Sequence, residues 1–210
     1  MFDINNFWLF ASATLLLNLT PGNDFIYVAS RSLNGGTRAG IISALGITCG
    51  LAVHVTASVL GLSILLAKSA LAFNLIRYIG AAYLLYLGVK MFITKAQPFR
   101  DINSCQQRIS SFALLKQGFL TNVFNPKVAL FFISFLPQFA DTNSRYFSEQ
   151  LFVLGLWFIF SGTLVSIAIA LFFSKLRNVL SSSPLFWKIQ QKFTALVLVL
   201  LGLKIAMEKK

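Results

Sequence analysis

The chain has 210 residues, of which 57% are hydrophobic and only 11% are charged. About a quarter of the residues in a soluble domain are charged, so this composition excludes one soluble core beneath a polar surface. The formal net charge of +12 would suit a nucleic-acid partner, but the basic residues stand singly or in pairs at the ends of apolar blocks. Lys and Arg mark membrane interfaces in this way, so we expect a lipid bilayer and no nucleic acid as the partner.

Six apolar segments follow one another, and a helix needs about 20 such residues to cross a bilayer. They cover residues 7–29, 41–67, 71–93, 112–137, 151–174 and 185–207. The N-terminus lacks a positive region before the first segment, which we therefore expect to be a retained helix and not a signal peptide. Residues 31–38 contain two arginines and a glycine pair, and predict a loop. The last segment starts with polar residues, so five spans and one interfacial helix are the alternative.

The six segments predict an all-α polytopic membrane protein built as a 3+3 inverted repeat, with transmembrane helices 1 and 4 broken at proline. Residues 1–95 would form the first three-helix repeat, 96–111 a polar linker and 112–210 the second repeat. Three spans in each half force the halves into opposite orientations. Eleven basic residues flank one side and six the other. The positive-inside rule then predicts a cytoplasmic linker and both termini outside.

Two proline motifs interrupt the first and fourth segments. Pro21 and Pro126 lie 105 residues apart, at corresponding positions of the two halves. A helix break within a bilayer is tolerated only inside protein or beside a water-filled cavity. Paired breaks of this kind point to the binding site of a transporter. We expect each motif to begin a new half-helix, with Thr20 and Asn125 as N-caps and the prolines at the first helical position.

Each break also carries a charge. Asp24 and Lys127 fall in the first turns of the new half-helices, whose dipoles favour a carboxylate and disfavour an ammonium. A charge at the bilayer centre costs about 2.5–3.5 kcal/mol, which argues for a functional pair; a static ion pair joining the halves is the alternative. Two helix N-termini aimed at the midplane would suit a substrate carboxylate. The candidate substrate- and proton-binding residues are Thr20, Pro21, Gly22, Asn23, Asp24, Asn125, Pro126 and Lys127.

Three further polar residues within the spans are candidates for the transport pathway: Thr48, His54 and Thr163. An imidazole can exchange protons near neutral pH, so His54 could relay protons; a neutral histidine bonded to a neighbouring helix is more common, and we favour it. The two threonines could line the pathway or bond the carbonyl four residues back in their own helices. Gly46 and Gly50 have the spacing that lets two helices approach closely, and we expect them to pack.

The sequence argues against catalytic and metal sites. The chain has one histidine, and its spans hold neither a carboxylate pair nor a metal-ligand spacing, so a membrane hydrolase is difficult to assemble. A membrane thiol oxidoreductase of similar layout would need cysteines beside the breaks, whereas Cys49 lies in a span and Cys105 in the linker. A passive small-solute pore remains an alternative. We expect no enzyme activity, no metal and no cofactor.

Four stretches together form a specific pattern: residues 20–24, 36–50, 77–88 and 125–139. In these stretches, and over its whole length, the chain resembles the LysE/RhtB family of amino-acid exporters. Residues 20–24 are similar to the family's Thr-Pro-Gly-Pro-Asp motif, with Asn23 in place of the second proline. The resemblance implies efflux of an amino acid or derivative of the homoserine, threonine and leucine class across a bacterial inner membrane, by proton antiport. It leaves the individual substrate and a homodimer open.

Overall fold

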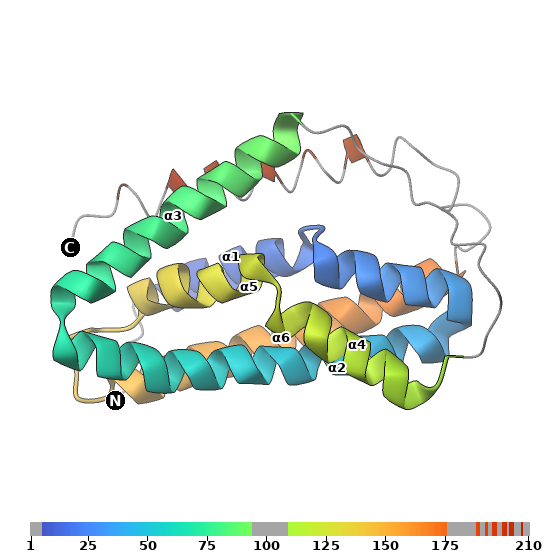
Figure 1. Ribbon diagram of the computed structural model, residues 1–210, viewed down its shortest axis with the longest axis horizontal. Helices are drawn as coiled ribbons and strands as arrows, with labels where there is room; N and C mark the ends of the chain where they lie inside the picture. The colour runs from blue at the N-terminus through green and yellow to red at the C-terminus, as the bar shows by residue number, and fades with distance from the viewer. Residues whose placement is uncertain are drawn as a thin grey trace.

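The computed structural model describes residues 6–93 and 109–175, together with separate positions between 188 and 207. All regular structure in these residues is helical, and the longer helices run along one axis of the molecule (Figure 1). The elements are α1 (Phe7–Leu19), α2 (Asn23–Lys68), α3 (Ala70–Ile93), α4 (Ser111–Val123), α5 (Pro126–Leu130), a π-helical turn η1 (Phe131–Phe135), a 3-10 turn η2 (Leu136–Phe139) and α6 (Phe147–Lys175).

Gly36 divides α2 into two helices that run in opposite directions. Its φ of 74° and ψ of −173° are open to glycine, because glycine has no Cβ to clash. Figure 1 shows the chain reversing here, at one end of the molecule. The predicted loop over residues 31–38 is therefore wrong, since helix continues up to this glycine and resumes directly after it. The arginine at the start of that stretch is helical, and Arg31 donates to Gln117 of α4 at 2.8 Å.

Glycines bring α2 and α4 into close contact. A Cβ added to Gly46 would lie 2.3 Å from the carbonyl oxygen of Leu115 and 3.1 Å from the Cα of Gly118. A Cβ on Gly50 would lie 2.7 Å from the Cβ of Asn122. Only residues without side chains allow backbones this near to each other. The prediction that Gly46 and Gly50 pack two helices together is confirmed.

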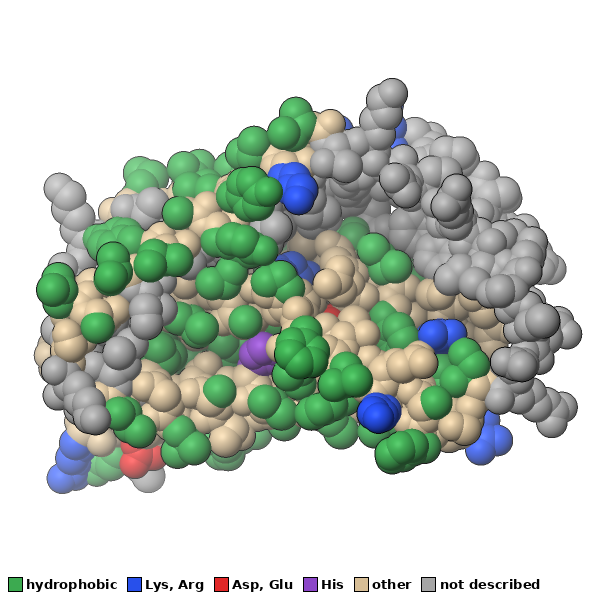
Figure 2. Space-filling model, in the orientation of Figure 1, with side chains coloured by type: hydrophobic (Ala, Val, Ile, Leu, Met, Phe, Trp, Pro, Cys, Tyr) green, Lys and Arg blue, Asp and Glu red, His purple; other side chains and the backbone are tan. Residues whose placement is uncertain are grey.

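Hydrophobic side chains cover the surface as well as the interior. They are spread over the coloured part of the face in Figure 2, and charged side chains are sparse among them. Leu71 on α3 and Phe112 on α4 are 81% and 75% exposed. Apolar surface of this extent is unfavourable in water and favourable in lipid. The exposed side chains therefore indicate a surface that faces a bilayer.

Two helices of the described residues are long and apolar enough to span a membrane: α2, counted over Asn23–Leu62 across the reversal at Gly36, and α6. The segments Ser111–Val123 and Pro126–Phe139 add a third span if the pair, bent by 45°, is counted as one. The protein is thus a helical membrane protein, as predicted. The predicted third span matches α3. The sixth predicted span, 185–207, and the linker, 96–111, fall largely outside the described residues.

The close contact of α2 with α4 generates a stability prediction. Gly46→Ala should cost about 1–3 kcal/mol of unfolding free energy, because the new methyl group meets backbone atoms that cannot yield. Gly61→Ala is the matched control, since nothing lies within 4 Å of a Cβ there. Thermal unfolding of the two variants in detergent measures the difference. Equal melting temperatures for the two variants would contradict the close contact.

Candidate functional site: the paired helix breaks

The first break separates α1 from α2. The hydroxyl of Thr20 donates to the carbonyl of Leu16 at 2.5 Å, which closes the end of α1, and α2 begins only at Asn23. The predicted N-cap role of Thr20, with Pro21 at the first helical position, is therefore wrong. Its side chain bonds the carbonyl four residues back, a local alternative that threonine hydroxyls often adopt.

The second break follows the prediction. The side-chain oxygen of Asn125 accepts a hydrogen bond from the backbone nitrogen of Lys127 at 3.1 Å, and Pro126 begins α5. Proline fits this position because its missing N–H would have no partner in the first turn. Both breaks lie near the middle of the long axis of the molecule in Figure 1. At each break one helix thus ends and the next begins, near the middle of the molecule.

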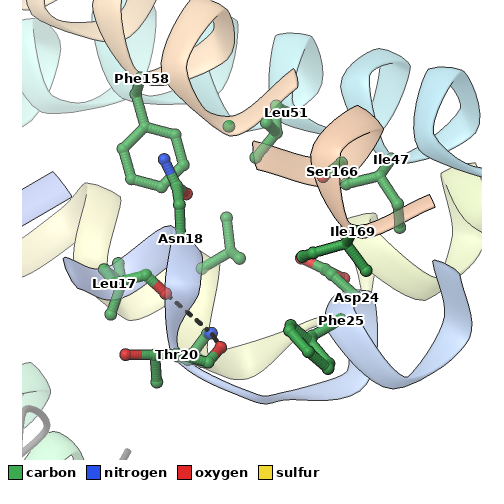
Figure 3. Close-up of a pocket in the computed structure, with 13 residues that line it drawn as sticks. Leu17, Asn18, Thr20, Asp24, Phe25, Ile47, Leu51, Phe158, Ser166 and Ile169 are labelled. Carbon is green, nitrogen blue, oxygen red and sulfur yellow. Dashed lines mark hydrogen bonds between the residues drawn. The ribbon is translucent and has the colours of Figure 1, made fainter. Parts of the chain in front are cut away.

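Lys127 crosses from the second break to the first. Its ammonium donates to the carbonyl of Thr20 at 3.0 Å and to that of Leu17 at 3.4 Å (dashed in Figure 3). These carbonyls end α1, where the helix dipole is negative and favours a cation. Asp24 interacts with this charge at longer range. Within the described residues no ion pair joins the two, so the static ion pair considered above is not formed.

Gly22 makes room for the lysine. A Cβ added to it would lie 3.1 Å from Nζ of Lys127 and 3.4 Å from its Cε. The backbone of Gly22 has no positive φ, so this glycine is needed for space and not for conformation. Gly22 of the first break therefore leaves space for the side chain of Lys127 from the second break.

Asp24 lies in the first turn of α2, as predicted. Its Oδ2 accepts a hydrogen bond from Nδ2 of Asn122 at 2.8 Å, while its Oδ1 is buried without a hydrogen-bond partner. The side chain of Asn125 also interacts with this carboxylate. The sequence analysis missed Asn122, which is fully buried at the end of α4. The sequence marks Asn122 only by its amide side chain, which stands in an apolar segment four residues before Pro126.

Asp24, Lys127 and Thr20 line one cavity of about 30 Å³ (Figure 3). It lies between α1, both halves of α2, α5 and α6. A cavity of this size holds about two water molecules. Asn18, which the sequence analysis missed, and Ser166 add polar groups. The remaining lining residues are Leu17, Phe25, Ile47, Leu51, Val128, Phe158, Gly162 and Ile169.

The three pathway candidates lie outside this cavity. Thr48 donates to the carbonyl of Ala44 at 3.0 Å and pairs with Thr163 of α6 at 2.8 Å. His54 donates from Nε2 to the main-chain carbonyl of Asn122 at 3.0 Å. All three side chains thus join α2 to another helix, and none is among the residues that line the cavity.

No group of three metal-ligating side chains occurs among the described residues. Cys49 is a free, exposed thiol on α2 that does not line the cavity, and Cys105 lies outside the described residues. The residues around the cavity thus offer two opposite charges, hydroxyl and amide groups, and apolar walls. Such groups are complementary to a small polar solute.

The fold and the site define a helical membrane protein in which two broken helices frame a charged cavity. The chain belongs to the family of the LysE type translocator, whose model matches residues 15–209.

Relatives are similar over most of their length. An uncharacterized membrane protein, YrhP, of Bacillus subtilis is 33% identical over 204 residues, which cover 90% of this chain and 92% of the relative. An uncharacterized membrane protein of Vibrio cholerae is 34% identical over 73% of this chain and 74% of its own length. A leucine efflux protein of Salmonella typhimurium is 29% identical over 73% of this chain and 72% of its own length. No solved structure matches the chain.

The contact between Gly22 and Lys127 generates a prediction. Gly22→Ala should destabilise the protein by about 0.5–1.5 kcal/mol, because the methyl group pushes the ammonium a few tenths of an ångström from its carbonyl partners. In a Lys127→Ala background the same substitution should cost little, because the side chain that it displaces is gone. Thermal unfolding of the double-mutant cycle gives the coupling energy. A cost that is the same in both backgrounds would show that the glycine does not act through Lys127.

Proposed function

We propose that the protein is a secondary transporter that exports an amino acid of the homoserine, threonine and leucine class from the bacterial cytoplasm. It acts in the inner membrane by proton antiport. The observation that carries this proposal is the pair of opposite charges, Asp24 and Lys127, that face one cavity without neutralising each other. The family membership and the relatives named leucine efflux proteins support it.

The two charges are complementary to the main-chain groups of an amino acid. The buried, unpaired Oδ1 of Asp24 can accept a hydrogen bond from a substrate ammonium. An ammonium has three donors, and Lys127 uses two of them on backbone carbonyls, so one is left for a substrate carboxylate. A zwitterionic amino acid would supply an oppositely charged group to Asp24 and another to Lys127.

The walls of the cavity suit an aliphatic side chain. They consist of apolar residues of α1, α2, α5 and α6, with Gly162 opening space on α6. Asn18 and Ser166 add polar groups beside them, which a hydroxyl-bearing side chain could use. We therefore take leucine as the first probe and threonine as the second.

The cavity is small and is lined by residues of two apolar clusters, which supports alternating access over a passive pore. Phe10, Phe131 and Phe158 belong to one cluster; Phe25 and Phe173 belong to the other and pack edge to face at 5.6 Å. About 30 Å³ is too small for an amino acid. Helices must therefore move apart on one side before a substrate can enter.

The spacing of the two breaks supports six spans arranged as a 3+3 inverted repeat, and the distribution of basic residues supports both termini outside. The carbonyls of Leu17 and Asn122 lie 105 residues apart, as the two prolines do, and each accepts from a basic side chain of the other half. Asp24 is the proposed proton carrier, because a carboxylate can bind either a proton or a substrate ammonium. Exclusive binding of this kind is what antiport requires.

The role of Asp24 is tested by Asp24→Asn in proteoliposomes loaded with leucine. We expect leucine efflux driven by a pH gradient to fall at least about tenfold, because an amide neither attracts an ammonium nor releases a proton. Asp141→Asn, on the segment before α6, is the matched control and should keep the wild-type rate. Unchanged driven efflux in Asp24→Asn would rule out the proposed role.

Selectivity is tested at Gly162. A Cβ there would lie 3.2 Å from Cδ1 of Leu51 and 3.4 Å from Oδ1 of Asn18, so Gly162→Ala narrows the cavity. The ratio of leucine to alanine counterflow should fall about tenfold or more, since one methylene is worth about 1–3 kcal/mol in such a pocket. Gly61→Ala is the control. If Gly162→Ala leaves the ratio of leucine to alanine counterflow unchanged, the substrate side chain does not bind in this cavity.

A further inference from the structure

His54 lies on α2 and is not among the residues that line the cavity. Its ring stacks on that of Phe132 with centroids 5.9 Å apart and planes 16° apart. Its Nε2 lies 3.0 Å from the main-chain oxygen of Asn122, and since a carbonyl can only accept, the imidazole donates. The ring is thus fixed between the end of α4 and the η1 turn.

The carbonyl that His54 binds belongs to the last turn of α4, where the break leaves carbonyls without helical partners. The same oxygen accepts the backbone nitrogen of Asn125 at 2.9 Å. Its counterpart 105 residues earlier, the carbonyl of Leu17, accepts from Lys127. A basic side chain from the other half therefore caps each broken helix end.

Asn122 contacts both His54 and Asp24. Nδ2 of Asn122 donates to Oδ2 of Asp24 at 2.8 Å. On its other side Asn122 packs against Gly50, where a Cβ would lie 2.7 Å from its Oδ1. A shift of the end of α4 would move this amide and release the carboxylate. Geometry thus links His54 to Asp24 through one residue.

We propose that His54 is a positioning residue: its hydrogen bond to the Asn122 carbonyl fixes the end of α4 and so aims the Asn122 amide at Asp24. The imidazole acts as a hydrogen-bond donor and relays no proton. This inference rests on the proposed function, in which Asp24 binds the substrate ammonium.

Two variants separate positioning from proton relay. The amide of His54→Gln can still donate to the carbonyl but cannot carry a proton, while His54→Leu can do neither. With leucine as the probe in proteoliposomes, His54→Gln should keep the KM and the pH-driven rate of the wild type within about twofold. His54→Leu should raise KM about tenfold, the effect of one lost hydrogen bond at a charged site. Loss of pH-driven efflux in His54→Gln, or a normal KM in His54→Leu, would overturn the proposal.

A spectroscopic measurement tests the bond independently of transport. His54 is the only histidine among 210 residues, so protein labelled with 15N-histidine and purified through a tag without histidine gives one imidazole spectrum. The proposal predicts a ring that carries a proton at Nε2. A ring protonated only at Nδ1 could not donate to Asn122 and would overturn it. If the wild type shows no saturable leucine counterflow, the proposed function fails while this result still decides the bond.

Discussion

The carbonyl groups freed at the ends of α1 and α4 are the constraint on which the rest of this structure depends. Lipid offers no hydrogen-bond donors, so a helix that ends within a bilayer must find them inside the protein. Lys127 supplies donors to Leu17 and Thr20, and His54 supplies one to Asn122. Each donor comes from the other half of the chain. These donors add to the local ones, the hydroxyl of Thr20 at the first break and the backbone nitrogen of Asn125 at the second.

This exchange explains how two opposite charges remain apart around one cavity. The dipole of α5 opposes an ammonium at Lys127, but the side chain reaches the negative end of α1, where the dipole favours it. Asp24 lies at the positive end of α2 and takes an amide hydrogen from Asn122. Each charge is stabilised by a helix end instead of by the other charge. Both therefore stay available to a ligand, which a direct ion pair would exclude.

The sequence predicted those features that depend on local chemistry. The two proline breaks, the asparagine cap at Asn125, the charges at Asp24 and Lys127 and the close packing at Gly46 all follow from residue type and spacing. Two local predictions were wrong. Thr20 bonds its own helix instead of starting the next. Residues 31–38 form helix because a single glycine makes the whole turn.

What the sequence did not reveal depends on contacts between distant residues. Nothing near Gly22 in the chain indicates that it makes room for a side chain 105 residues away. Asn122 is one amide among several, and only the fold places it between Asp24 and His54. The partner of Lys127 is a set of backbone carbonyls, which every residue carries and no sequence pattern marks.

The most direct test of this account is an experimental structure of the protein with leucine bound, at a resolution that shows side chains. The account predicts the leucine ammonium at Asp24 and its carboxylate at Lys127, with the lysine still bonded to the carbonyl of Thr20. A direct ion pair between Asp24 and Lys127, with leucine bound elsewhere, would contradict it.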